Sequence, residues 1–145
     1  MTLEGEYEPS PWDPVAEQVR VYEETDGRER WDLEGQPCVI LTTKGRKSGK
    51  LRKTPLMRVE HDGRYVVVAS LGGAPDHPVW FLNLTANPDV TLRDRDKVMD
   101  LRARVASPEE KAEWWPRATA VWPAYDDYQA STDRDIPVVI LEPVA

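Results

Sequence analysis

The chain has 145 residues, 40% of them hydrophobic and 31% charged, with a formal net charge of −7 at pH 7. This length suffices for one domain with a substantial core and is too short for two. The balance of apolar and charged residues is that of a folded protein, not of a disordered chain. The sequence pI near 4.9 argues against nucleic acid as the main partner.

The N-terminal region is acidic and predicts a tail followed by a helix. Residues 1–11 contain two prolines, and we interpret them as a loose tail ahead of a single domain over residues 12–145. Apolar residues recur at helical spacing from Trp12 to Tyr22, which predicts a helix over residues 12–24. Residues 1–34 hold eleven acidic residues against three arginines, and anionic lipid would repel them. With no long apolar stretch and no signal-peptide pattern, we expect no stable membrane insertion and a soluble, cytoplasmic protein.

Extended segments dominate the rest of the chain. We expect strands at residues 37–43, 51–60, 64–70, 90–93, 98–105 and 136–141. His61-Asp62-Gly63 predicts a hairpin turn, and the apolar run that follows it predicts a central strand buried on both faces. The strands form hairpins without a regular βαβ pattern, and no Gly-x-Gly-x-x-Gly motif occurs. This order favours an antiparallel barrel with helices packed outside over a Rossmann sheet.

Two further helices interrupt the strands. Asp76 is the expected cap of a short helix that ends near Asn87-Pro88. Ser107-Pro108-Glu109-Glu110 forms a capping box that begins the last helix. Pro116 and Pro123 are expected to kink or split that helix.

A basic stretch lies between the first two strong strands. The 25 residues from 35 to 59 hold seven Lys or Arg and no acidic residue, on a chain that is otherwise acidic. A loop bracketed by Gly45 and Gly49 lies inside it, and we expect these glycines to adopt positive φ and the loop N–H groups to form an anion-binding nest. The glycine spacing and Leu51 exclude a Walker loop. Taken alone, the stretch fits a solvated basic hairpin equally well.

Several separated motifs then occur in order: Leu41-Thr-Thr-x-Gly-Arg-Lys-Ser-Gly-x-x-Arg52, Thr54-Pro55-Leu56, Val68-Ala-Ser-x-Gly-Gly73 and His77-Pro-x-Trp80-x-Leu-Asn83-Leu-x-Ala-Asn87-Pro88. Together they resemble the deazaflavin-dependent nitroreductase family over about residues 37–143. The resemblance implies an α+β fold, an antiparallel split β-barrel of the FMN-binding type. It also implies coenzyme F420, an 8-hydroxy-5-deazaflavin with a phosphate and a polyglutamate tail. Its reduced form delivers a hydride to a small-molecule acceptor of the quinone, nitro or enone type.

The resemblance implies a coenzyme site drawn from four segments and one late tyrosine: Arg46, Lys47, Ser48, Arg52, Lys53, Thr54, Pro55, Leu56, Met57, Val68, Ala69, Ser70, Leu71, Val79, Trp80, Phe81, Leu82, Asn83 and Tyr125. The residue types agree, because Arg and Lys suit phosphate and carboxylates and the apolar residues suit a flat ring. Trp80 fits a core position better than a stacking role. Asn83 fits either a hydrogen bond to the ring system or a helix cap. Leu71 stands where many relatives have Lys, which removes one positive contact.

The acceptor side is predicted at Trp122, Tyr125 and Tyr128, which are spaced by three and share one helical face. A core stripe would give the same spacing, but the adjacent acidic residues indicate a surface element. The resemblance also implies substrate-contacting tyrosines here. Tyr125 is the candidate catalytic donor, with Ser70 as a second, and Met57 is a further substrate contact. Met57 stands where nitroimidazole-reducing relatives have Tyr, which favours a quinone or another flat electrophile.

Other chemistries have little support. Cys38 lies in an apolar run and is expected to be a buried small side chain. His61 and His77 are too few and too far apart for a metal site, and none is predicted. Two alternatives to an F420H2-dependent reductase stay open: a deazaflavin-binding protein without reductase activity, and an FMN-dependent split-barrel oxidoreductase. The sequence leaves the oligomeric state open.

Overall fold

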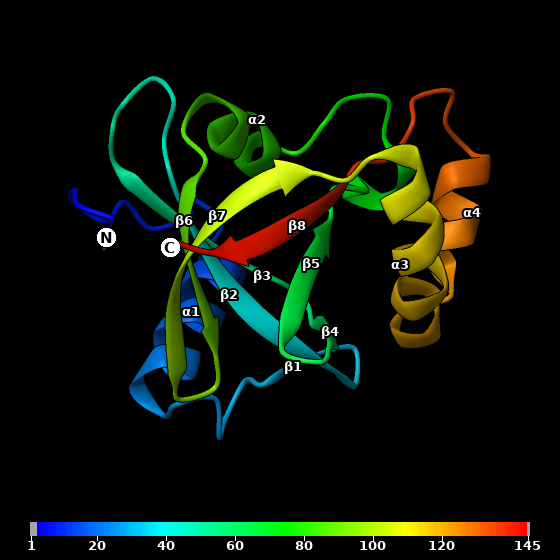
Figure 1. Cartoon of the computed structure of the whole chain (residues 1–145). Coiled ribbons are helices and arrows are strands. Elements are labelled where there is room, and N and C mark those ends of the chain that lie inside the picture. Colours follow the sequence, from blue (N-terminus) through cyan, green and yellow to red (C-terminus); the bar gives the residue numbers. More distant parts are fainter. Residues whose placement is uncertain (1–2, 145) are drawn as a thin grey trace.

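A computed structural model describes residues 3–144. Within them eight strands form one sheet (Figure 1): β1 Asp32–Leu33, β2 Gln36–Lys44, β3 Leu51–Met57, β4 Val59–His61, β5 Arg64–Val68, β6 Asp89–Asp94, β7 Lys97–Val105 and β8 Val138–Pro143. The helices are α1 Asp13–Glu24, α2 Val79–Ala86, α3 Pro108–Val121 and α4 Ala124–Ala130, with a short 3-10 turn, η1, at Leu71–Gly73. No helix of the described chain is long and apolar enough to cross a membrane.

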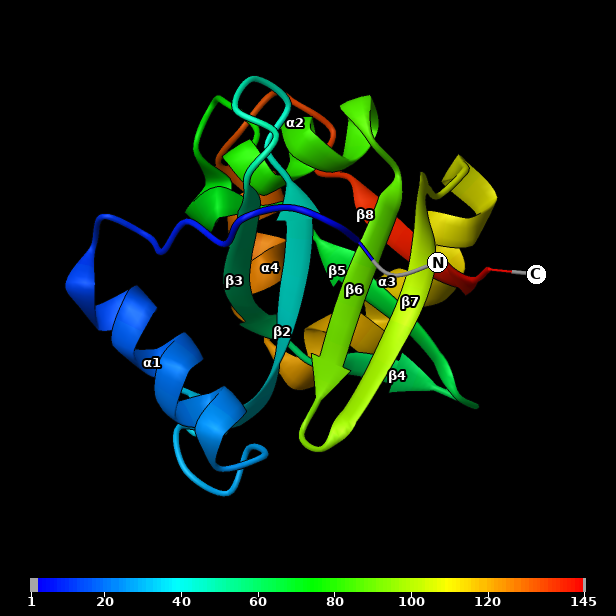
Figure 2. The same cartoon turned by 90° about the vertical axis from the view of Figure 1, so that its left-hand side faces the viewer.

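The sheet curls into a barrel because its two ends belong to one segment of chain. Its strand order is β1-β2-β6-β7-β8-β5-β4, with β3 paired to β2, and every strand pair is antiparallel. β3 pairs with β2 near one end of this order, and β4 pairs with β5 at the other end. Only Arg58 separates β3 from β4 in the chain, so the two ends of the sheet are brought together. α1 lies against one side and α3 with α4 against another (Figures 1 and 2). The predicted antiparallel barrel with outer helices is confirmed.

One carboxylate holds the closing segment in place. Asp94, at the end of β6, accepts hydrogen bonds from Arg58 Nε at 2.8 Å and from the Tyr65 hydroxyl at 2.6 Å. These contacts join the break between β3 and β4 to β5 and β6. Burial, then the hydrogen bond to Asp94, raises the pKa of Tyr65 to about 12, so the phenol stays a donor at neutral pH.

Successive side chains of a strand point to opposite faces of the sheet, so one strand contributes to two hydrophobic cores. In β5, Tyr65 and Val67 face the barrel interior, whereas Val66 and Val68 pack with α3 and α4. In β2, Val39 and Leu41 face the interior, whereas Cys38 and Ile40 pack under α1. The apolar run of β5 is therefore covered on both faces, as predicted. Burial raises the pKa of the Cys38 thiol to about 12, which fits its expected role as a buried small side chain.

Two local predictions need correction. The strand expected over residues 51–60 breaks at Arg58, whose N–H bonds to the Pro37 carbonyl. Asp76 does not cap α2: it lies in a bend two residues before the N-cap residue, Pro78, which makes no side-chain cap bond. Strand β1 was not predicted. The predicted split of the last helix is confirmed at Pro123, while Pro116 is accommodated within α3.

The N-terminal segment is not loose at residues 6–8. The Leu51 N–H bonds to the Glu6 carbonyl at 2.8 Å, and the Glu8 N–H bonds to the Leu51 carbonyl at 2.9 Å. Tyr7 thereby forms a parallel bridge with Leu51, and Figure 2 shows this segment crossing the sheet before α1. The division into a tail over residues 1–11 and a domain from residue 12 stays a proposal.

A glycine sets the distance between η1 and α4. Gly73 has a φ of +82°, and a Cβ there would lie 2.5 Å from Ser131 Oγ and 3.0 Å from the Tyr128 carbonyl oxygen. Gly72 also has a positive φ, +63°, but a Cβ there would meet nothing within 4 Å. Both glycines therefore need a left-handed backbone conformation, but only at Gly73 would an added Cβ collide with neighbouring atoms.

We predict that Gly73→Ala lowers the free energy of unfolding by about 1–3 kcal/mol more than Gly72→Ala. Both variants carry the left-handed backbone cost of about 1–2 kcal/mol, and only the first forces η1 away from α4. Urea unfolding of the two variants measures the difference. Equal destabilisation would show that the close approach at Gly73 is not constrained.

Candidate functional site

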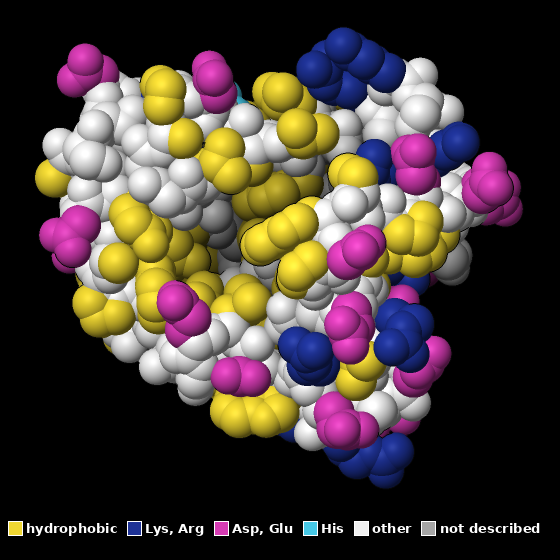
Figure 3. Space-filling view, turned by 180° about the vertical axis from the view of Figure 1, so that it is seen from behind, with side chains coloured by type: hydrophobic (Ala, Val, Ile, Leu, Met, Phe, Trp, Pro, Cys, Tyr) yellow, Lys and Arg dark blue, Asp and Glu magenta, His cyan; other side chains and the backbone are white. Residues whose placement is uncertain are grey.

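A cavity of about 600 Å³ opens between β3 and the end of β5. Figure 3 shows the molecule hollowed on this side, with apolar side chains around the hollow. β3, η1, α2, α4 and the chain around α1 all contribute to its walls. Of the predicted site residues the structure brings together Arg52, Lys53, Thr54, Pro55, Leu56, Met57, Val68, Ser70, Leu71, Val79, Trp80, Asn83, Trp122, Tyr125 and Tyr128.

Six predicted residues do not line this cavity. Ala69 and Phe81 belong to the barrel core, and Leu82 packs against it. The prediction took whole segments, whereas the end of β5 and α2 each turn some of their residues into the core and others toward the cavity. Arg46, Lys47 and Ser48 lie in the loop between β2 and β3, outside the lining.

Six lining residues were missed: Ser10, Val15, Leu33, Glu34, Gly72 and Pro78. Gly72 and Pro78 lie inside the quoted motifs, so the motifs could have included them. The other four precede the region of resemblance, and no pattern in the sequence links them to β3.

Asn83 fixes the basic loop to the barrel. Its side chain is only 3% exposed. Its Oδ1 accepts from the Arg46 N–H at 3.2 Å, and its Nδ2 donates to Thr43 Oγ1 at 3.3 Å. Its side chain does not cap the helix end in the described chain, where the Asn87 N–H bonds to the Asn83 backbone carbonyl. Asn83 also lines the cavity, and a hydrogen bond to the ring system stays a prediction. Asn83 on α2 therefore links the loop after β2 to the rest of the barrel through Arg46 and Thr43.

The backbone of this loop is largely occupied by its own contacts. The N–H groups of Gly45, Gly49 and Lys50 bond within the loop, and that of Arg46 bonds to Asn83. Only Gly49 of the two bracketing glycines has a positive φ. These four groups are therefore not available to the expected backbone nest, which leaves the side chains and the N–H groups of Lys47 and Ser48 to bind an anion.

Three cations of the basic stretch have acidic partners from distant parts of the chain. Arg52 pairs with Glu8 at 3.2 Å, Lys53 with Glu23 at 2.8 Å, and Arg58 with Asp94 at 2.8 Å. The expected uncompensated island is thus smaller than its sequence implies. Lys44, Arg46, Lys47 and Lys50 have no ion pair within residues 3–144.

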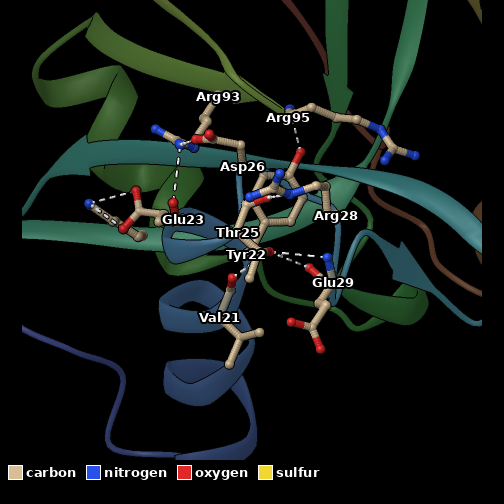
Figure 4. Close-up of polar contacts among 10 residues, drawn as sticks. Val21, Tyr22, Glu23, Thr25, Asp26, Arg28, Glu29, Arg93 and Arg95 are labelled. Carbon is tan, nitrogen blue, oxygen red and sulfur yellow. Dashed lines mark hydrogen bonds and ion pairs between the residues drawn. The ribbon is translucent and has the colours of Figure 1, made fainter.

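Glu23 is held by the firmly anchored end of α1 (Figure 4). Its carbonyl accepts from Arg93 Nη2 at 3.2 Å, and Arg93 also pairs with Asp26. The neighbouring Tyr22 hydroxyl accepts from the Arg95 N–H at 2.7 Å. Lys53 is therefore held by a partner that is itself fixed.

The predicted aromatic residues meet at one wall of the cavity. Trp122 Nε1 donates to the Tyr128 hydroxyl at 3.2 Å, and the Tyr125 and Tyr128 rings meet edge to face at 6.2 Å. They do not share one helical face as predicted, because Trp122 precedes α4 and a turn at Pro123 brings its ring to Tyr128.

Tyr125 has the properties of a donor to a bound molecule. It is 5% exposed and lines the cavity, yet its hydroxyl has no hydrogen-bond partner in the described chain. Burial raises the pKa of this phenol above the ordinary value of 10.0, so the proton stays on oxygen at neutral pH. The Ser70 side chain, 8% exposed, also lines the cavity.

Arg134 organises the loop that carries Ser70, and no pattern in the sequence indicated this role. Its guanidinium donates to the carbonyls of Ala69 at 3.0 Å, Ser70 at 2.6 Å and Ala74 at 2.8 Å. It also contacts His77 Nδ1 at 3.1 Å, so His77 supports this loop and does not line the cavity. The remaining histidine, His61, packs on the edge of Trp114. Within residues 3–144 no group of His, Cys, Asp or Glu side chains is suited to a metal ion.

A barrel with an open side, a cavity of ligand size at the opening and cations at its edge defines a class of coenzyme-binding protein. The chain belongs to the F420H2-dependent quinone reductase family, whose model matches residues 15–143. The split-barrel fold class, the oxidoreductase class and coenzyme F420 are thereby confirmed.

Individual relatives agree with this assignment. A candidate F420H2-dependent quinone reductase of Mycobacterium tuberculosis, Rv3178, is 38% identical over 107 residues, 74% of this chain and 90% of its own. The F420H2-dependent quinone reductase Rv1261c of the same organism is 34% identical over 130 residues, 83% of this chain and 84% of its own. A solved F420H2-dependent reductase, FDR-A, is 52% identical with a TM-score of 0.69, covering 73% of this chain and 94% of that one.

We predict that Arg134→Ala accelerates amide hydrogen exchange at Gly73 and Ala74 by about tenfold or more. Both amides bond within the loop that Arg134 holds, and bonds from a charged donor stabilise by about 1.5–3 kcal/mol. Arg134→Lys should not restore protection, because an ammonium lacks the planar fork. Arg102→Ala, which removes an exposed pair with Asp89, is the control. Unchanged exchange in Arg134→Ala would contradict the anchoring role.

Proposed function

We propose that this cavity holds the deazaflavin ring of reduced F420 and a quinone side by side, and that the chain catalyses hydride transfer between them. The observation that carries the proposal is the hydroxyl of Tyr125, a residue only 5% exposed, which lines the cavity and has no protein partner in the described chain. Nitro and enone-type acceptors belong to the proposal as further substrates. A cytoplasmic location, expected from the sequence, is also part of it.

The residues present fit the coenzyme. The cavity volume of about 600 Å³ falls within the range of about 300–1,000 Å³ common for ligand pockets. Pro55, Val68 and Trp80 offer apolar contact to a flat ring. Arg52 and Lys53 lie in the same lining and suit the phosphate and the carboxylates of the tail.

The reduced coenzyme supplies the hydride, and the protein supplies binding, orientation and electrostatics. Tyr125 donates a hydrogen bond to the acceptor oxygen, where negative charge grows as the hydride arrives. Its raised pKa keeps this proton in place. Ser70 is the second donor, held at the cavity wall through Arg134. Trp122 and Tyr128, bonded to each other, form the wall beside the acceptor.

Two other functions remain as competitors. A binding protein without reductase activity would use the same cavity, but it would not need a phenol in the cavity wall whose hydroxyl has no partner in the described chain. FMN carries one phosphate, and the four basic side chains without an ion pair in the described chain, Lys44, Arg46, Lys47 and Lys50, exceed what one phosphate needs. Both features favour a deazaflavin reductase.

We predict that the protein binds oxidised F420 more tightly than FMN and that this affinity falls as salt rises. Exposed charges are screened beyond about 10 Å at 0.1 M salt, so contacts to the anionic tail weaken. Difference spectroscopy at two salt concentrations measures both effects, and reduced F420 with menadione should then give turnover. Tighter binding of FMN would contradict the coenzyme assignment. Binding without turnover would support the binding-protein alternative.

We predict that Tyr125→Phe lowers kcat by about tenfold or more, with little change in the Kd for F420. The substitution keeps the ring in its packing and removes only the hydroxyl. Ser70→Ala is the matched comparison, because it removes the other candidate donor from the same cavity. Steady-state kinetics with menadione measure the effects. Unchanged turnover in Tyr125→Phe would make Tyr125 a wall of the cavity and not a donor.

A further inference from the structure

The N-terminal arm, residues 4–8, lies along the strand that carries the cations of the cavity. Its backbone pairs with Leu51 on both sides of Tyr7. Lys53 Nζ lies over the Tyr7 ring, 4.8 Å from its centroid. The arm is acidic, with glutamates at positions 4, 6 and 8. It therefore places negative charge where the proposed coenzyme site needs positive charge.

Glu8 makes the contact that matters most. Its carboxylate pairs with Arg52 Nη1 at 3.2 Å, and the two side chains are 43% and 35% exposed. Arg52 lines the cavity, as does Ser10 just beyond the arm. The pair thus sits at the edge of the cavity and in contact with solvent, where another carboxylate can reach the same guanidinium.

The pair between Lys53 and Glu23 differs from it. These side chains are 21% and 28% exposed, and α1 fixes Glu23 through Arg93 (Figure 4). The arm, in contrast, is held by a short ladder to Leu51. Of the two acidic partners, Glu8 is the one that an incoming anion can replace.

We propose that Glu8 competes with the anionic tail of the coenzyme for Arg52, so that the arm sets how strongly the protein favours tailed over tail-less coenzyme. The inference rests on the proposed function. One guanidinium cannot give its best hydrogen bonds to two carboxylates, and the unpaired carboxylate repels the other. The competition lowers the affinity for tailed coenzyme and leaves ring binding unchanged.

The test measures equilibrium binding of F420 with its polyglutamate tail and of the 8-hydroxy-5-deazaflavin riboside, which lacks phosphate and tail, by deazaflavin fluorescence. Glu8→Gln should tighten binding of tailed F420 by roughly two- to fivefold, the scale of an exposed ion pair, and leave riboside binding unchanged. Glu6→Gln is the matched control, because it removes the same charge from the same arm, and the Glu6 side chain is exposed and unpaired in the described chain.

A double-mutant cycle assigns the effect to the pair. In an Arg52→Ala background, Glu8→Gln should no longer tighten binding. Equal tightening by Glu6→Gln, or equal tightening for the riboside, would overturn the proposal in favour of a general charge effect. Weaker binding in Glu8→Gln would make the arm part of the coenzyme site. If the parent protein binds neither deazaflavin, the proposed function itself fails; if it binds both and Glu8→Gln changes nothing, only this inference fails.

Discussion

The shape of the molecule depends on a single carboxylate, that of Asp94. It accepts from Arg58 at the break between β3 and β4 and from Tyr65 on β5. The first contact holds the segment that closes the barrel, and the second holds the strand on the far side of the opening. Because β3 and β5 are fixed in this way without forming a ladder between them, space for a ligand remains where the barrel is split.

The site is assembled around that opening by segments from both halves of the chain. β3 supplies one wall, and α4 supplies the aromatic wall opposite. Gly73 allows η1 to approach α4 closely, while Arg134 holds the carbonyls of the same loop. Asn83 fixes the basic loop from beneath. Supporting contacts of this kind keep a site rigid, which is what hydride transfer between two bound molecules requires of a protein.

Local patterns predicted much of the fold. The apolar run of β5, the turn at Asp62-Gly63 and the capping box at Ser107 follow from rules that act over a few residues. The motifs predicted most of the cavity lining. The anchoring role of Arg134 could not be predicted, because its partners are backbone carbonyls some sixty residues away. Every residue type has a backbone carbonyl, so the sequence does not mark which ones accept a hydrogen bond.

The distribution of charge on the folded protein was the property that the sequence predicted least well. The stretch from residue 35 to 59 contains no acidic residue, yet Glu8, Glu23 and Asp94 reach it in the folded chain. Net charge along a sequence therefore describes the surface poorly when strands bring distant residues together. The cations without an ion pair in the described chain lie at the end of β2 and in the loop between β2 and β3.

A crystal structure of the protein with oxidised F420 bound would show directly where the coenzyme lies. We expect the deazaflavin ring in the cavity between β3 and α4, in contact with Val68 and within reach of the Tyr125 hydroxyl, with the anionic end of the coenzyme near Arg52. A ring bound elsewhere, with this cavity unchanged and Tyr125 still without a partner, would contradict this expectation.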